Sequence, residues 1–189
     1  MIFTEDIKQS LSVLKNGGTI LYPTDTLWGI GCDATNAAAV EKILRIKSRD
    51  EAKSFIILVN SVSMVERYVR EVPPIAYDLA DVSDIPLTII YPKAKNLAPG
   101  IPAEDGSVGI RICNDVFCNE LISRLRRPIV STSANISGEP APLNFSEISP
   151  SLIEAVDYTV LYRREDRQEK SSSPIIRVEM NGVISIIRK

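Results

Sequence analysis

The chain has 189 residues, of which 44% are hydrophobic and 24% are charged, and its formal net charge is −2. A chain of this length and composition is expected to fold as one globular domain over residues 1–189, and no apolar run approaches the roughly 18 residues that a membrane-spanning helix needs. The acidic balance gives no broad basic face for non-specific binding of nucleic acid, but it is compatible with a local basic pocket.

Helical and strand patterns alternate in the first half of the chain. Apolar residues at helical spacing predict helices, short apolar runs predict strands, and polar residues or glycines mark the ends of both. In chain order, the elements are a helix capped by Thr4 and ended by Gly17, a strand at 18–23, a helix from Asn36 that runs to Lys47 and Arg49, a strand at 55–59, a helix from Ser61 to Arg70, a helix from Pro74 to about Val82 and a strand at 87–91.

The second half continues with the same two patterns. In chain order, its elements are a strand at 107–112, a helix from Asn114 with Val116 among its inward residues, a strand at 128–132, a helix near 146–155, a strand at 158–162, a polar run at 163–173 and strands at 174–180 and 183–188. The polar run is interpreted as a solvated loop. Asn181 and Gly182 predict a type I′ hairpin turn between the last two strands.

The order of these elements indicates the fold class. Strands and helices alternate too irregularly for a strict βαβ series, and the C-terminal hairpin must be antiparallel. We therefore expect an α/β or α+β domain with a twisted, mixed parallel and antiparallel sheet flanked by helices.

The chain has no histidine, which excludes Ser/His/Asp triads, Cys/His dyads and the commonest zinc sites. Cys32, Cys113 and Cys118 are odd in number and lack a zinc-like spacing, so we expect buried or half-buried thiols and no metal site built from them. The N-terminal segment lacks the pattern of a signal peptide, so we expect a cytoplasmic protein.

The segment KSRDEAK places three cations where a helix leads into a buried strand. These are Lys47, Arg49 and Lys53. Cations favour the C-terminal ends of helices, so the cluster is compatible with a solvated helix end. The alternative is a clamp for a triphosphate, because Lys and Arg stabilise the charge that builds on a phosphoryl group during its transfer.

Two segments rich in hydroxyl groups follow predicted strands. STSANISG contributes Ser131, Ser133 and Asn135, and YPTDTLWG contributes Thr26. Each segment fits an ordinary polar turn. Strand ends in α/β sheets also bind ligands, and hydroxyls with an amide would suit a ribose, a phosphate or a zwitterion.

Two further residues have more than one interpretation. Arg111 lies in an apolar strand, where a buried cation needs an anionic partner from either the protein or a ligand. Trp28, like Tyr22, is more typical of a core aromatic than of a platform for a nucleobase.

Taken together, these segments resemble the YrdC family of threonylcarbamoyl-AMP synthases. The resemblance rests on YPTDTLWGIGCDA (family pattern Y-P-T-[DE]-T-x-[YW]-G-[IL]), on K-x-R with a following lysine, on SVGIR and on STSANISGEPAP, and it covers nearly the whole chain. It implies a twisted mixed sheet around a basic central cavity. It also implies an enzyme that makes threonylcarbamoyl-AMP and pyrophosphate from L-threonine, bicarbonate or CO2, and ATP, for the threonylcarbamoyladenosine modification of tRNA.

The resemblance also implies a role for each matching residue. Thr26, Arg111 and Ser173 would bind L-threonine, and the expected catalytic residues are Lys47 and Arg49. The residues that would bind ATP are Arg49, Lys53, Ser107, Ser131, Ser133, Asn135, Ala141 and Arg188. Mg²⁺ would accompany ATP, held largely by the phosphate oxygens and water, with no dedicated protein metal site.

The chain departs from the family pattern in the loops. Asp50 and Ser54 stand where the family usually has proline, Leu58 stands where some members have histidine, and 163–172 replaces a glycine-containing segment. Two alternatives remain open: an RNA-binding relative without catalysis, and a carbamoyl-adenylate-forming domain like that of hydrogenase maturation proteins. The expected partners are proteins that transfer the product to tRNA, with at most weak RNA binding and no membrane.

Overall fold

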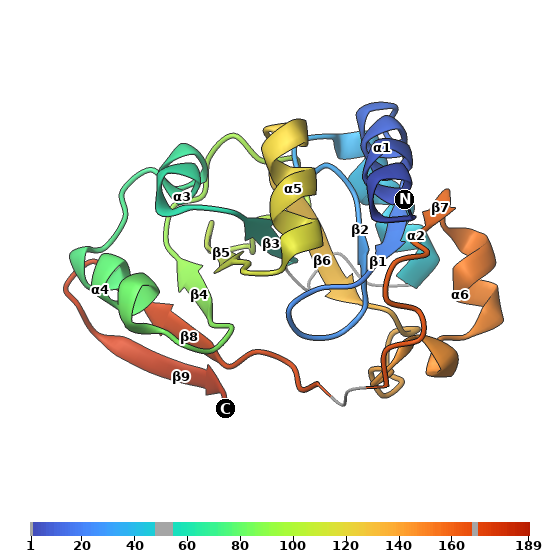
Figure 1. Cartoon of the computed structure of the whole chain (residues 1–189). Coiled ribbons are helices and arrows are strands. Elements are labelled where there is room, and N and C mark those ends of the chain that lie inside the picture. The colour runs from blue at the N-terminus through green and yellow to red at the C-terminus, as the bar shows by residue number, and fades with distance from the viewer. Residues whose placement is uncertain (1, 48–54, 168–169) are drawn as a thin grey trace.

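The computed structural model describes residues 2–47, 55–167 and 170–189, and its main feature is one mixed sheet (Figure 1). The sheet has nine strands within these residues, in the order β7-β1-β2-β6-β3-β5-β4-β8-β9. The strands are β1 (Ile20–Tyr22), β2 (Gly29–Gly31), β3 (Ile56–Val59), β4 (Thr88–Tyr91), β5 (Val108–Ile112), β6 (Ile129–Ser133), β7 (Tyr158–Thr159), β8 (Ile175–Val178) and β9 (Ile184–Arg188).

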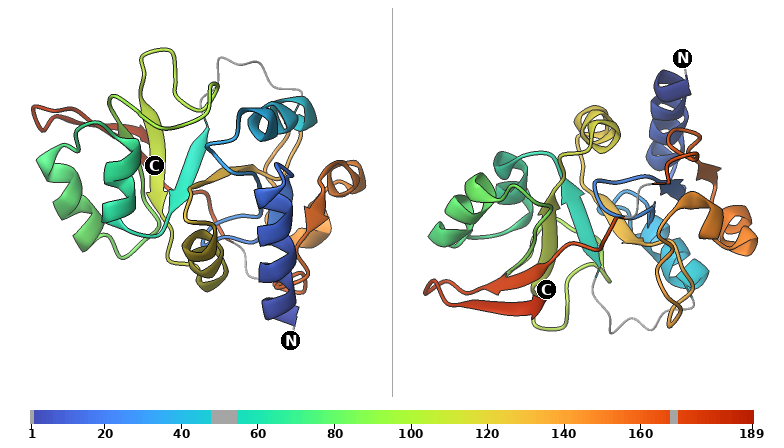
Figure 2. Two further views of the ribbon diagram at one scale, coloured as in Figure 1. Left: turned by 90° about the horizontal axis from the view of Figure 1, so that it is seen from above. Right: turned by 60° about the horizontal axis from the view of Figure 1, so that its bottom comes forward.

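Parallel and antiparallel pairs are mixed along the sheet. The pairs β1–β7, β3–β5 and β4–β8 are parallel, whereas β1–β2, β2–β6, β3–β6, β4–β5 and β8–β9 are antiparallel. The views in Figure 2 show the twist between the strands at the two ends of the sheet. The predicted mixed sheet with flanking helices is therefore confirmed.

Six α-helices accompany the sheet in the described residues. They are α1 (Ile2–Lys15), α2 (Ala37–Lys47), α3 (Val62–Tyr68), α4 (Pro74–Val82), α5 (Val116–Leu125) and α6 (Pro150–Ala155). Figure 1 shows α1 and α5 side by side, α3 and α4 near the β4 end of the sheet, and α6 near the β7 end. None of these helices is both long and apolar enough to cross a bilayer.

Packing in the core explains why the sequences of the central strands are continuous apolar runs. Strand β3 pairs along its edges with β5 and β6, and its successive residues 57–59, whose side chains point to alternate faces, are all fully buried. Both faces of the strand are therefore covered. Helix α2 buries Val40 and Ile43 on one face. Burial of each such side chain contributes about 1.5–3 kcal/mol to the free energy of unfolding.

Of the helix starts predicted at Thr4, Asn36, Ser61 and Asn114, two are confirmed and two are wrong. The side chain of Asn36 accepts a hydrogen bond from Ala39 N at 3.1 Å, and Ser61 Oγ accepts one from Met64 N at 3.3 Å. Thr4 is not a cap, because α1 already includes Ile2. Helix α5 is capped by Asp115 in place of Asn114.

Three other local predictions are corrected. Val116 does not face inward, because it lies at the first position of α5 and is 69% exposed. The helix predicted near 146–155 begins at Pro150, after a 3₁₀ turn at Phe145–Glu147. The strand predicted at 158–162 forms ladder pairs only over Tyr158–Thr159.

The hairpin between β8 and β9 exists, but its turn type is wrong. Gly182 has a positive φ of 83°, and Asn181 does not have the positive φ that a type I′ turn needs. Gly182 N donates to Glu179 O at 2.9 Å, and Glu179 N donates to Val183 O at 3.0 Å. The loop is therefore a three-residue connection that ends in a left-handed glycine, the second most common hairpin solution.

The polar run at 163–173 is not simply solvated. Arg163 forms ion pairs with Asp115 at 2.6 Å and Asp166 at 2.7 Å, and its side chain is only 18% exposed. Arg164 donates to Thr159 O and Val160 O at 2.7 and 2.8 Å. These contacts connect the beginning of the run to α5 and to the chain after β7.

The three cysteines are buried and unpaired, as the sequence analysis expected. Burial is the main reason that the pKa values of the Cys32 and Cys118 thiols lie above their ordinary value. We therefore expect Ellman's reagent to react very slowly with the native protein and rapidly with all three thiols in guanidinium chloride. Fast reaction of a thiol in the native protein would contradict the packing around it.

Candidate active site

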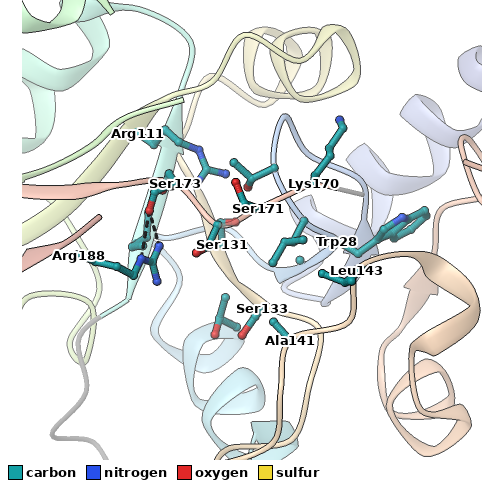
Figure 3. A pocket seen from close by; sticks show the side chains of 16 residues that line it. Trp28, Arg111, Ser131, Ser133, Ala141, Leu143, Lys170, Ser171, Ser173 and Arg188 are labelled. Carbon is teal, nitrogen blue, oxygen red and sulfur yellow. Dashed lines mark hydrogen bonds between the residues drawn. The ribbon is translucent and has the colours of Figure 1, made fainter. Parts of the chain in front are cut away.

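A cavity of about 450 Å³ lies where segments from distant parts of the chain meet. Its wall comes from the β1–β2 loop, the strands β3, β5, β6 and β9, and two later loops. The lining residues are Thr26, Leu27, Trp28, Gly29, Ile56, Arg111, Ser131, Thr132, Ser133, Ala141, Leu143, Lys170, Ser171, Ser172, Ser173 and Arg188. Figure 3 shows Arg111, Ser173 and Arg188 on one side of this space and Trp28 and Leu143 on the other.

The turn after β1 is fixed by hydrogen bonds of Thr24. Its hydroxyl donates to Leu27 O at 2.7 Å and accepts from Thr26 N at 3.0 Å. Thr24 is nearly fully buried, whereas Thr26 lies at the cavity wall. A hydroxyl turn of this kind therefore holds Thr26 in place without a regular secondary structure.

Hydrogen bonds from Lys47 stabilise the loop after β6. Its ammonium donates to Ser133 O at 2.7 Å, to Asn135 O at 2.5 Å and to Asn135 Oδ1 at 3.0 Å. Asn135 also accepts from the Ser133 hydroxyl and donates to Glu139 O at 2.5 Å. Lys47 is buried, and it sets the shape of the loop that carries Ser133 to the cavity.

Arg111 meets a carboxylate of the protein. Its guanidinium NH2 lies 3.0 Å from Asp25 Oδ1, and both side chains are buried, with 5% and 10% exposed. The sequence left open whether this cation pairs with the protein or with a ligand. In the structure it contacts Asp25 and still reaches the wall of the cavity.

The segment that carries Ser173 crosses the cavity and is held by two arginines. Arg111 NH1 donates to Ser173 Oγ at 3.4 Å, and the same hydroxyl lies 2.8 Å from Thr88 Oγ1. Arg188 donates to Ser173 O from Nε at 3.1 Å and from NH2 at 2.7 Å, as the dashed lines in Figure 3 show.

The charged side chains among the described lining residues are all cations. The pKa of the Arg188 guanidinium is lowered, first because burial disfavours its charged form and then because Arg111 carries a like charge nearby. Lys170 adds a third cation to the wall. A phosphate or carboxylate in the cavity would neutralise this excess of positive charge.

The structure brings together seven of the residues predicted to bind ligands. These are Thr26, Arg111, Ser131, Ser133, Ala141, Ser173 and Arg188. Lys47 and Asn135 are not among the lining residues, but the hydrogen bonds between them position the loop that carries Ser133. Arg49 and Lys53 fall outside the described residues.

Ser107 is a further predicted ligand residue that does not line this cavity. Its hydroxyl donates to Asp105 Oδ1 at 2.6 Å and lies near Arg177, which pairs with Asp105 at 2.8 Å. Hydrogen bonds donated by the hydroxyl and the backbone N–H of Ser107 are also the main reason that the pKa of Asp105 falls to about 2. This arrangement stabilises the start of β5 and does not bring Ser107 to the cavity wall.

Sequence reasoning missed several lining residues. Trp28 is buried, as expected of a core aromatic, yet it also faces the cavity while it packs on Phe145 with a ring-centroid distance of 4.9 Å. Its position two residues after Thr26 was a usable signal. Lys170 gave no local signal, because it belongs to the polar run whose path depends on contacts such as Lys170 Nζ to Thr24 O at 3.3 Å.

The family of the chain follows from its whole length. The family model for Sua5, YciO and YrdC proteins, described as telomere recombination, matches residues 12–189. The chain belongs to this family. A threonylcarbamoyl-AMP synthase from Stenotrophomonas maltophilia is 33% identical over 154 residues, which cover 80% of this chain and 83% of that protein.

Solved structures of Sua5 and HypF share the fold. The structure of P. abyssi Sua5 complexed with L-threonine has a TM-score of 0.82 and 26% identity, and it covers 94% of this chain and 52% of that one. The chain thus spans about half the length of P. abyssi Sua5. Full-length HypF in its phosphate- and nucleotide-bound form has a TM-score of 0.82 and 26% identity, over 97% of this chain and 28% of that chain.

Proposed function

We propose that this family member is an L-threonylcarbamoyl-AMP synthase that joins L-threonine, bicarbonate or CO2, and ATP, and releases pyrophosphate. The observation that carries the proposal is the convergence of Arg111, Arg188 and the hydroxyls of β6 on one cavity. Relatives that are named threonylcarbamoyl-AMP synthase match most of the chain, and a related Sua5 structure holds L-threonine.

The amino acid would lie in the part of the cavity that is lined by the β1–β2 loop and by β5. Arg111 would bind its carboxylate, because a guanidinium fork matches the two carboxylate oxygens. Ser173 would hold the same end of the amino acid from the crossing segment, and Thr26 would contact it from the β1–β2 loop. All three side chains reach the same wall.

The nucleotide would occupy the part of the cavity that is lined by β6 and β9. Ser131 and Ser133 would surround the nucleotide, the backbone near Ala141 would contact it, and Arg188 would balance the phosphate charge. The sequence motif assigns Arg49 and Lys53 to the phosphates, and these two side chains would add further positive charge.

The chemistry would need positioning and charge neutralisation more than acid–base groups. The threonine amine and CO2 form a carbamate with loss of protons to solvent. A carbamate oxygen then attacks the α-phosphorus, the bond to the bridging oxygen breaks, and pyrophosphate leaves with its electron pair. This sequence is compatible with a chain that has no histidine.

Mg²⁺ would accompany ATP. No cluster of three or more potential metal ligands of the Cys, Asp and Glu type occurs in the described part of the chain, and the cavity offers mainly hydroxyls and cations. The donor set therefore fits a metal whose ligands are mostly phosphate oxygens and water, which is the usual environment of Mg²⁺. We further propose a cytoplasmic enzyme that passes its labile product to the proteins that modify tRNA, with at most weak RNA binding.

The HypF likeness raises carbamoyl-adenylate formation as the second candidate. The chain covers only 28% of HypF, whereas relatives named threonylcarbamoyl-AMP synthase match it over most of their own length. This favours L-threonine as the substrate.

The test is pyrophosphate release from a mixture of ATP, bicarbonate and Mg²⁺, with and without L-threonine. We expect release to depend on L-threonine and to fall strongly when L-serine replaces it. Release that is absent, or that does not depend on threonine, would contradict the proposed function. Release driven by carbamoyl phosphate would support the second candidate.

A further inference from the structure

Asp25 is a buried carboxylate with unused hydrogen-bonding capacity. Its side chain is 10% exposed, and neither Oδ1 nor Oδ2 accepts a hydrogen bond from any described residue. Arg111 NH2 lies 3.0 Å from Oδ1, but the geometry of this contact is that of an ion pair without a hydrogen bond. Arg111 Nε and NH2 likewise lack hydrogen-bond acceptors within the described chain.

Such a pair is costly unless a further group completes it. A carboxylate in a protein interior normally accepts several hydrogen bonds, and a guanidinium normally donates several. Here the acceptors of Asp25 and the donors of Arg111 are free at the same place. A ligand that carries both donors and acceptors would satisfy the two side chains together.

Protein atoms cover both carboxylate oxygens of Asp25, so a ligand reaches them by displacing the contact with Arg111. Asp25 lines a second cavity of about 470 Å³, which shares Thr26 and Lys170–Ser173 with the first. Arg111, on β5, lines the first cavity. The two paired side chains therefore belong to two cavities that share the segment carrying Ser173.

We propose that Asp25 recognises the α-ammonium group of the amino acid substrate, so that Asp25 and Arg111 together select a zwitterion. This inference rests on the proposed function and deepens it. The substrate carboxylate accepts hydrogen bonds from Arg111, and the substrate ammonium donates to Asp25. These two contacts replace the ion pair between Arg111 and Asp25. Asp25 is thereby a specificity-determining residue, and it fixes the nitrogen that becomes the carbamate.

The alternative role for Asp25 is to neutralise Arg111 without touching the substrate. The two roles differ in what they predict for a ligand that lacks the amine. If Asp25 acts only through Arg111, its loss weakens every carboxylate ligand equally. If it binds the ammonium, its loss weakens only ligands that carry one.

The experiment compares L-threonine with (R)-3-hydroxybutanoate, which keeps the carboxylate, hydroxyl and methyl groups but has no amine. Isothermal titration with α,β-methylene-ATP present measures both ligands on the wild type, D25N and D25E. In the wild type, we expect L-threonine to bind more tightly than (R)-3-hydroxybutanoate by about 30-fold or more, because hydrogen bonds between charged groups are the strong ones. D25N should remove most of this ratio, and D25E should restore much of it.

Each outcome has a defined meaning. If D25N weakens both ligands by the same factor, or leaves L-threonine unchanged, the role of Asp25 in recognition is overturned. Equal binding of the two ligands by the wild type overturns it without any variant, which covers the case in which D25N does not fold. Failure of the wild type to bind L-threonine at all would instead overturn the proposed function, and the inference with it.

Discussion

Replacement of Arg111 by methionine should lower kcat/KM for L-threonine in pyrophosphate release by a factor of roughly 100 to 1,000, because truncating one partner of a buried charged pair costs about 2–5 kcal/mol. The loss should appear mainly as a higher KM for L-threonine, while the KM for ATP changes little. The methionine side chain removes the proposed partner of the substrate carboxylate and leaves the carboxylate of Asp25 buried without a cation.

The variant needs two controls, because an unpaired Asp25 will also lower the free energy of unfolding. Arg111→Lys keeps the positive charge beside Asp25 and removes the guanidinium fork, so it should fold and show an intermediate KM. Arg177→Met removes a half-exposed arginine from the neighbouring region, where it pairs with Asp105 outside the cavity, and it should leave the KM for L-threonine within about 3-fold of the wild type. A normal KM for L-threonine in Arg111→Met would show that the substrate carboxylate binds elsewhere.

Replacement of Lys47 by methionine is expected to lower the free energy of unfolding by about 2–4 kcal/mol, because each buried acceptor that loses its donor costs about 1–3 kcal/mol. The ammonium donates to Ser133 O and to two oxygens of Asn135, and methionine offers none of these donors. Urea unfolding followed by circular dichroism measures the change. Pyrophosphate release should also fall, because the loop that carries Ser133 loses its support.

Lys42→Met is the matched control on the same helix. Its ammonium lies 3.6 Å from Asp157 with both side chains partly exposed, so its removal should change the free energy of unfolding by less than about 0.5 kcal/mol. If the two lysine variants unfold at the same urea concentration, Lys47 does not stabilise the loop as described here.

Much of the fold could be predicted because its signals are local. The apolar run of β3 and the caps of Asn36 and Ser61 depend on residues within a few positions of one another. Errors occurred where a boundary depends on a choice between neighbours, as at Asp115 against Asn114, or where one turn type competes with another, as at Gly182.

The site was predictable from its motifs but not from its geometry. Thr26 and Ser133 follow strands, which marks them as candidates. That Lys47 supports a loop 86 and 88 residues away, and that Asp25 contacts Arg111, depends on how the sheet brings β1, β5 and β6 together. The same holds for Arg163, whose partner Asp115 is 48 residues away, so the polar run could not be recognised as partly buried.

Mass spectrometry of the product formed from ¹³C-bicarbonate, ATP and L-threonine tests whether the amino acid reacts beside the nucleotide in one cavity. We expect threonylcarbamoyl-AMP that carries a single ¹³C atom, and we expect its amount to match the pyrophosphate released. An unlabelled threonyl-adenylate, or pyrophosphate release without any adduct of threonine, would show that the cavity does not join a threonine carbamate to the nucleotide.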